Sequence, residues 1–224
     1  MRKFFRDNGL SMFFFALFAI ALVLQAVAGH ADFNEDQDRH GGPHMSLGRY
    51  VVSSAFGTAV LENWQSEYLQ FTLFILMTVW LLQRGSPESK PLHKAGTGSD
   101  AEQRVGGHAT PKSPRWARMA GLRRRVYENS LLLAMGTIWV GSWFAQSITG
   151  VSEYNAERLD HSQVAVSWLD YLGRPDFWEK TLQNWQSEFL AVGSMAILAV
   201  YLRQRGSPES KPVGAPHEAT GAEG

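Results

Sequence analysis

A long apolar run near the N-terminus constrains the fold of this chain more than any other feature. Residues 10–28 include only Ser11 and Gln25 as polar side chains, and 19 helical residues extend about 28 Å, close to the thickness of a bilayer core. A second run of 19 residues, 130–148, includes small or polar residues that favour close helix contact: Gly136, Gly141, Ser142 and Gln146. Both runs are predicted to span a membrane, although the mean hydropathy of the whole chain is only −0.19.

Two shorter apolar runs occupy residues 68–82 and 189–202. They contain 15 and 14 residues, about 22 Å of helix each, which is too short to cross a bilayer alone. To cross fully, each run must include the polar residues before it, Asn-Trp-Gln-Ser-Glu at 63–67 and again at 184–188. We therefore predict spans at about 62–83 and 183–203, each with a polar motif drawn toward the membrane.

The two halves of the chain are related by a constant offset of 121 residues. The nonapeptide Gln-Arg-Gly-Ser-Pro-Glu-Ser-Lys-Pro occurs at 83–91 and at 204–212, and the pentapeptide at 63–67 recurs at 184–188. Sparser identities keep the same register, for example Asn34 with Asn155 and Tyr50 with Tyr171. A register without gaps from residue 2 to residue 91 indicates an internal duplication.

Each copy is predicted to form a two-helix hairpin, and an even number of spans makes both copies cross the bilayer in the same direction. The predicted fold is an all-α membrane protein, a pseudo-twofold bundle of four transmembrane helices formed by two parallel-repeat hairpins, with short outer amphipathic helices at 46–55 and 163–172. The predicted organisation is a first repeat at 1–91, a flexible cytoplasmic linker at 92–121, a second repeat at 122–212 and a disordered tail at 213–224.

Local signals predict where the shorter spans begin and end. The sequence Arg174-Pro175-Asp176 favours a helix start, because proline suits the first turn and an acidic residue stabilises the positive end. Gly85 and Gly206 fit helix C-caps, and the Ser-Pro that follows each would stop the helix.

Charge distribution predicts the orientation. Sixteen of the 21 lysines and arginines lie in the N-terminal segment, in 83–128 and after residue 202, which places both termini in the cytoplasm. The acidic residues show the opposite bias, so a net charge of zero is a spatial balance, and it argues against nucleic acid as a partner. A cleaved signal peptide is the alternative for the first run, since basic residues precede it and Ala26-Val27-Ala28 resembles a cleavage site.

The repeated pentapeptide is the strongest candidate site. Its Asn, Trp and Glu share one helix face, and twofold symmetry would bring Glu67 and Glu188 together, where two close carboxylates bind one proton more tightly than either alone. Gln25 and Gln146 lie at the same predicted depth and could bond to Gln65 or Glu67. The candidate polar or ion site comprises Asn63, Trp64, Gln65, Glu67, Asn184, Trp185, Gln186, Glu188, Gln25 and Gln146.

A structural interpretation of the pentapeptide stays open beside the functional one. Both glutamates could lie at the outer headgroup level, with Trp64 and Trp185 as interfacial anchors.

The nonapeptide supplies a second candidate, on the cytoplasmic side. Helix termination explains its glycine and proline, but not why Glu-Ser-Lys is kept in both copies. The residues of this cytoplasmic motif are Arg84, Glu88, Lys90, Arg205, Glu209 and Lys211.

Neither a metal site, a cofactor nor an enzymatic activity is predicted. The acidic segment 32–38 has the alternating oxygens of a calcium loop but not its glycine and terminal glutamate, so a solvated acidic loop is the better interpretation. The chain has no cysteine, and no phosphate-binding loop, metalloprotease helix or catalytic triad appears in it.

The doubled pentapeptide and nonapeptide, with Lys-Phe-Phe-Arg-Asp-Asn-Gly-Leu-Ser at 3–11, resemble a family of uncharacterised bacterial multi-pass inner-membrane proteins that carries a domain of unknown function. The resemblance covers nearly the whole chain outside the linker and tail. It implies the topology and location in a bacterial inner membrane, and it implies no catalytic residues.

Two functional hypotheses follow. In the first, the chain passes or senses a small ion, proton or solute through the paired polar motifs, as a channel, transporter or sensor. In the alternative, it is a non-transporting membrane scaffold that docks a cytoplasmic protein partner through the repeated Gly-Ser-Pro-Glu-Ser-Lys motifs. Because four helices enclose little space, a conduit would require a homodimer or a narrow path between the hairpins.

Overall fold

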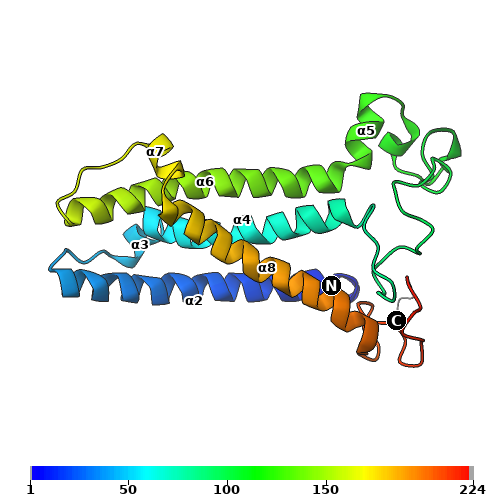
Figure 1. Cartoon of the computed structure of the whole chain (residues 1–224), viewed down its shortest axis with the longest axis horizontal. Coiled ribbons are helices and arrows are strands. Elements are labelled where there is room, and N and C mark those ends of the chain that lie inside the picture. Colours follow the sequence, from blue (N-terminus) through cyan, green and yellow to red (C-terminus); the bar gives the residue numbers. More distant parts are fainter. Residues whose placement is uncertain (1, 222–224) are drawn as a thin grey trace. The chain divides into compact units, whose positions relative to one another are not determined.

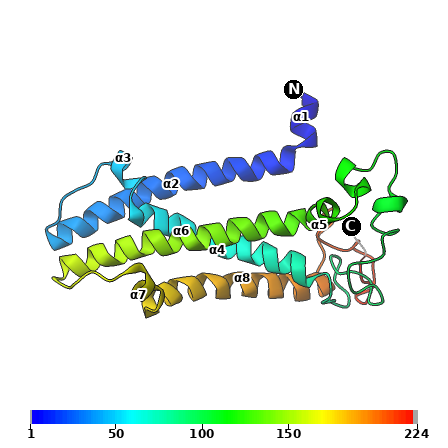
Figure 2. The same cartoon turned by 90° about the horizontal axis from the view of Figure 1, so that it is seen from above.

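The computed structural model describes residues 2–221, and these residues form helices and loops without a strand. They include eight α-helices (Figure 1), which confirm the all-helical prediction and are labelled from α1 to α8 in Figure 2. Their bounds are α1 Arg2–Asp7, α2 Gly9–His40, α3 Leu47–Tyr50, α4 Ser54–Met77, α5 Leu122–Glu128, α6 Ser130–Asp160, α7 Trp168–Leu172 and α8 Pro175–Tyr201. The chain divides into two compact units, Met1–Leu61 with Gln146–Tyr171, and Glu62–Ala145 with Leu172–Gly224.

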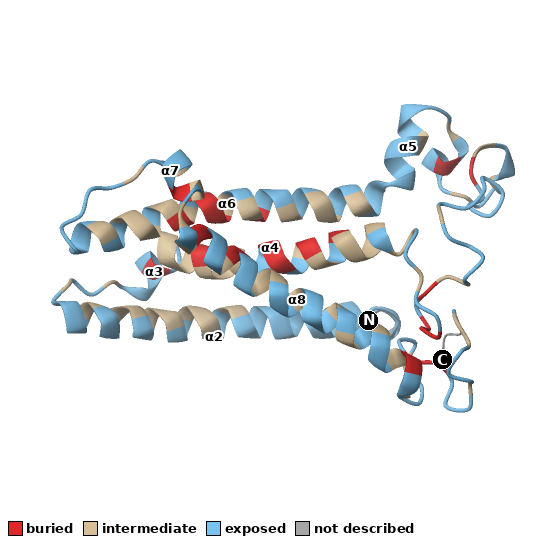
Figure 3. Ribbon diagram, viewed as in Figure 1, coloured by how far each residue is buried: buried red, intermediate tan, exposed pale blue. Residues whose placement is uncertain are grey.

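Two helices, α2 and α6, are long and apolar enough to cross a membrane. They contain 32 and 31 residues, so they extend about 48 and 46 Å. No residue of α2 is buried, and Figure 3 shows this helix exposed or half-buried along its length. An apolar helix that leaves its side chains exposed needs an apolar solvent or partner around it, which weakly supports a membrane location.

Both long helices continue past their apolar runs. The acidic segment 32–38, expected as a loop, lies within α2, where an ion pair between Glu35 and Arg39 and a contact between Asp36 and His40 occur at the i, i+4 spacing that stabilises a helix. The helix ends only at Gly41, whose φ of 70° is the left-handed conformation that glycine adopts readily. The apolar run therefore predicts the membrane-length part of the helix, and the glycine sets its end.

Within the first unit, an asparagine closes the loop after each long helix in the same way. Asn34 donates to the Met45 carbonyl at 3.0 Å and accepts from the Met45 N–H at 2.8 Å. Asn155 makes the same two bonds with Val166, at 2.9 and 2.8 Å. Both partners in each bond keep the offset of 121 residues, so equivalent positions form equivalent contacts.

A buried tyrosine follows each asparagine bridge. Tyr50, on α3, and Tyr171, on α7, are 6% and 1% exposed. The hydroxyl of each lies against a glycine of the preceding long helix, Gly29 for Tyr50 and Gly150 for Tyr171. The two short helices fall inside the segments expected to be helical, 46–55 and 163–172, but are shorter than predicted.

Within the second unit, an aromatic cluster joins α6 to α8. The ring of Trp143 lies 6.2 Å from Phe177, 6.1 Å from Trp178 and 5.6 Å from Trp185 between centroids. Trp143 also donates its indole N–H to the Thr181 hydroxyl at 3.4 Å. Stacked, edge and tilted ring contacts of this kind add to the free energy gained by burial.

The helix ends agree with the sequence at one point and differ at another. The structure confirms the start of α8 at Pro175, with Asp176 in its first turn. The C-cap prediction for Gly85 and Gly206 is wrong, because α4 ends at Met77 and α8 at Tyr201, well before these glycines. Their φ values of 83° and 79° instead belong to turns inside the repeated nonapeptides.

Residues 92–121, the predicted linker, contain two short 3-10 helices, Gly106–His108 and Arg115–Arg118. The second of these contacts α5, where the rings of Trp116 and Tyr127 lie 6.5 Å apart. The predicted flexibility of the linker stays a prediction. Part of the predicted disordered tail, 222–224, lies outside the described residues.

Replacement of Gly150 by alanine tests the packing of the buried tyrosine. The added Cβ would lie 2.6 Å from the Tyr171 hydroxyl, so we expect Gly150→Ala to lower the free energy of unfolding by about 1–3 kcal/mol. Gly141→Ala on the same helix is the matched control, because its added Cβ meets no atom within 4 Å. Thermal unfolding followed by circular dichroism measures both variants, and equal stabilities would contradict the proposed contact.

Candidate functional site

The second unit contains both copies of the pentapeptide, the first on α4 and the second on α8. Gln65 and Ser66 are buried, whereas Asn63, Trp64 and Glu67 are exposed. In the second copy Gln186 is exposed, while Asn184, Trp185 and Glu188 are half-buried. The two copies are thus identical in sequence but unequal in environment.

A hydrogen bond between the two copies joins α4 to α8. The indole N–H of Trp185 donates to the Gln65 side-chain oxygen at 2.7 Å, and Gln65 itself is completely buried. The Gln65 amide nitrogen donates to the Glu62 carbonyl at 3.1 Å, so both ends of this buried amide are satisfied. Because Trp185 also packs against Trp143, one side chain contacts α4 and α6 together.

The two pentapeptide glutamates interact electrostatically, and Glu188 also interacts with the Ser66 side chain. Each pentapeptide serine also donates to the asparagine carbonyl three residues earlier, Ser66 to Asn63 and Ser187 to Asn184. The structure therefore joins Gln65 to Trp185, and Glu188, three residues after Trp185 on α8, interacts electrostatically with the exposed Glu67. Since Gln65 and Glu67 are two residues apart on α4, they lie on different faces of that helix.

Gln25 and Gln146 lie in the other compact unit, on α2 and α6. Gln25 is half-buried and Gln146 is only 2% exposed. Their hydrogen bond to Gln65 or Glu67 stays a prediction.

The repeated nonapeptides form matching closed turns. The Gln83 N–H donates to the Ser89 hydroxyl at 3.0 Å, and the Gln204 N–H donates to Ser210 at 2.9 Å. Each serine hydroxyl then donates to the carbonyl of the lysine that follows it, at 3.1 Å in both copies. This turn explains why the serine is present in both copies. The sequence did not predict the turn.

The lysine of each nonapeptide holds the segment that follows it. Lys90 donates to the Gly96 carbonyl at 2.8 Å. Lys211, which is 1% exposed, donates to the carbonyls of Pro216, His217 and Ala219. These ammonium groups are therefore satisfied by the chain's own backbone, while Arg84 and Arg205 are exposed.

The glutamates of the two nonapeptides meet. A hydrogen bond with Glu209, followed by burial and by the negative charge of Glu209, raises the pKa of Glu88 to about 7. A hydrogen bond between two carboxyl groups requires one proton, so the pair carries a single negative charge below that pH. The sequence motif pointed to these residues, but not to their contact with each other.

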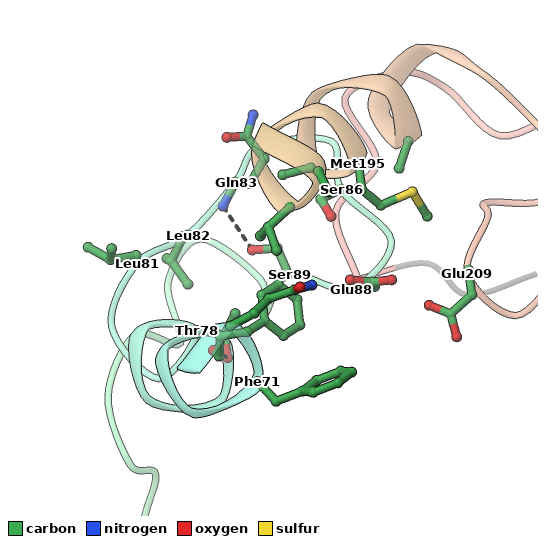
Figure 4. Close-up of a pocket in the computed structure, with 16 residues that line it drawn as sticks. Phe71, Thr78, Leu81, Leu82, Gln83, Ser86, Glu88, Ser89, Met195 and Glu209 are labelled. Carbon is green, nitrogen blue, oxygen red and sulfur yellow. Dashed lines mark hydrogen bonds between the residues drawn. The ribbon is translucent and has the colours of Figure 1, made fainter. Parts of the chain in front are cut away.

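A cavity of about 510 Å³ lies between α4, α8 and the first nonapeptide. Figure 4 shows Glu88 and Glu209 on one side of it, with Phe71 and Met195 among the apolar side chains around them. Glu88 and Glu209 are the titratable residues among the described side chains that line it. The cavity therefore combines apolar walls with one acidic end.

Replacement of Gln65 tests the bond between α4 and α8. We expect Gln65→Ala to lower the free energy of unfolding by about 1–3 kcal/mol, since the Trp185 indole N–H then loses its partner in a buried setting. Gln186→Ala, at the exposed equivalent position, is expected to change it by less than about 0.5 kcal/mol. Chemical unfolding of the detergent-solubilised variants measures both, and a smaller loss at position 65 than at 186 would refute the role of the bond.

Replacement of Glu209 tests the carboxyl pair. Glu88 is expected to titrate near pH 7 in the wild-type chain, and Glu209→Gln should lower its pKa because the like charge disappears. Carboxyl carbon shifts of selectively labelled protein measure the titration, with Glu218→Gln as the control in the same tail. A wild-type Glu88 that titrates with ordinary glutamates would show that the pair does not form.

Comparison with known proteins places the chain in a family. The model of a domain of unknown function, DUF6766, matches residues 1–222. No curated protein and no solved structure matches the chain significantly. The match confirms the expected relationship to an uncharacterised family and adds no catalytic or binding residue. Since the match covers nearly the full length of the chain, this protein belongs to the DUF6766 family, whose domain has no known function.

Proposed function

We propose that this chain is a four-span membrane protein that passes a proton or small cation between α4 and α8. Polar and ionisable side chains in a membrane-spanning helix pair are costly, and their usual explanation is a functional pathway. The observation that carries the proposal is the buried Gln65–Trp185 hydrogen bond between these helices, with Glu188 near enough to Glu67 to interact electrostatically with it.

The membrane assignment of α4 and α8 rests on length and surface chemistry. They contain 24 and 27 residues, about 36 and 40 Å of helix, so either is long enough to cross a bilayer core. Large apolar side chains are exposed on both, including Trp64 and Met77 on α4 and Leu190 and Ile197 on α8. Exposed side chains of this kind favour lipid over water.

The duplication supports two parallel hairpins. The asparagine bridges, the buried tyrosines and the nonapeptide turns each recur with the offset of 121 residues. Equivalent residues of a twofold pair can touch each other only near the symmetry axis. Glu67 interacts electrostatically with Glu188, and Glu88 with Glu209, as expected of equivalent residues near such an axis.

A pathway along that axis would run from one carboxyl pair to the other. The cavity lies between α4 and α8 and has Glu88 and Glu209 at its acidic end, while Glu67 precedes its lining residue Gln70 by one helical turn. The scaffold alternative depends instead on the nonapeptides as docking motifs. Because their serines and lysines bond to the chain's own backbone, we favour transport.

Ion flux in liposomes tests the proposal. We expect the wild-type chain to dissipate an imposed proton or cation gradient, and Glu67→Gln/Glu188→Gln to reduce the flux by about tenfold or more because both ionisable groups are removed. Glu179→Gln is the matched control, since Glu179 is an exposed glutamate on α8 that lies outside the pentapeptide.

The readouts are a pH-sensitive dye inside the vesicles and cation-selective electrodes outside. Circular dichroism of the reconstituted protein establishes that each variant is folded. Wild-type flux no higher than that of protein-free liposomes, or full flux through the double variant, would overturn the proposal.

A further inference from the structure

The cavity beside α4 and α8 is formed by equivalent positions of the two repeats. Three of these pairs, each 121 residues apart, are Gln70 with Ala191, Phe71 with Val192 and Thr78 with Ala199. In each pair the first copy carries the larger side chain and the second the smaller. The cavity therefore lies where small residues of the second copy face larger residues of the first.

The charge of the cavity is unbalanced. Glu88 and Glu209 line it together, and neither a lysine nor an arginine is among the described residues of its wall. The nearest nonapeptide lysines bond to backbone carbonyls elsewhere, Lys90 at Gly96 and Lys211 at His217. Two facing carboxylates without a basic side chain favour either a shared proton or a bound cation.

The rest of the cavity wall has too few oxygen ligands for a bare metal ion. Hard cations such as calcium take six to eight oxygen ligands, whereas this wall is mostly apolar, with Phe74, Val192 and Met195 among its residues. Its volume of about 510 Å³ lies within the range of pockets that take small organic molecules. The rings of Phe71 and Phe74 can also attract a cation through their faces.

We propose that this cavity binds an amphipathic organic cation, with a protonated amine between Glu88 and Glu209 and an apolar body against α4 and α8. The amine replaces the proton that otherwise joins the two carboxyl groups and donates hydrogen bonds to both. The apolar body occupies the space left by the small residues Ala191 and Ala199 of the second copy. This inference does not depend on ion passage, because it requires only the second compact unit and no flux.

Binding is expected to depend on pH. Glu209 is the titratable group that faces Glu88 in this cavity, and their contact raises the pKa of Glu88 to about 7. Below that pH the shared proton competes with the ligand, and above it both carboxylates are free to bind an amine that is still protonated. Affinity for an organic amine should therefore rise as the pH increases from about 6 to about 8, whereas affinity for a neutral analogue should not.

Naphthylethylamine and its neutral analogue naphthylethanol test the proposal, because they share one apolar body. Titration calorimetry with the full chain in detergent, against empty micelles, measures binding of each probe at about pH 6 and about pH 8. We expect the amine to bind about tenfold or more tightly than the alcohol at the higher pH, and to lose most of that advantage at the lower pH.

Three variants separate the charge from the cavity. Glu88→Gln/Glu209→Gln keeps side chains that can hydrogen bond to each other, and it should lower amine affinity to that of the alcohol. Glu218→Gln, in the same tail but outside the cavity wall, should leave the affinity unchanged. Ala196→Phe should reduce binding of both probes because it fills the cavity.

Circular dichroism and size-exclusion chromatography establish that each variant is folded, and Met195→Trp replaces Ala196→Phe if that variant is not. Equal affinity for amine and alcohol, or amine binding that persists in the double glutamine variant, would overturn the proposal. None of these experiments measures flux, so amine binding can be established even if the chain transports no ions.

Discussion

The contact between Trp185 and Gln65 is the interaction on which the arrangement of α4 and α8 depends. It buries an amide completely on α4, and such an amide must be satisfied by a partner of fixed geometry. An apolar contact could slide by a turn at little cost, whereas a 2.7 Å hydrogen bond specifies one register. That register brings Glu188 beside Ser66 and leaves the cavity further along the same two helices.

The repeated nonapeptide combines two separate roles in one short motif. Its serine and lysine act within each copy, where they close the turn and hold the following segment. Its glutamate acts between copies, because Glu209 interacts with Glu88 and raises its pKa to about 7. The serine and lysine are needed in both repeats because each stabilises its own copy. The glutamate is needed in both repeats because each one pairs with the other.

Much of the fold follows from local sequence signals. The long apolar runs predict α2 and α6, and the proline and acidic residue at 175 and 176 predict where α8 begins. The end of α2 is missed because an acidic segment with i, i+4 contacts continues a helix well past its apolar part. Gly85 and Gly206 are misassigned because a left-handed turn is required inside a loop as often as at a helix end.

The candidate site is predicted only in part, for a different reason. The duplication identifies Glu67, Glu188, Glu88 and Glu209 as residues that a twofold arrangement could pair, but not which glutamine of the pentapeptides is buried. Gln65 is buried and Gln186 exposed although their local sequences are identical, so the choice depends on tertiary contacts with Trp185. Sequence periodicity contains no information on that choice.

Fusion of the two repeats in one chain allows them to become unequal. In a homodimer every pair of facing positions must carry the same residue, so enlarging a cavity on the axis would shrink both walls together. In this chain Phe71 faces the cavity from the first copy and Val192 from the second, and Thr78 corresponds to Ala199. The carboxyl pair stays symmetric while the walls diverge, which is the combination that a site for an asymmetric ligand with one charged end requires.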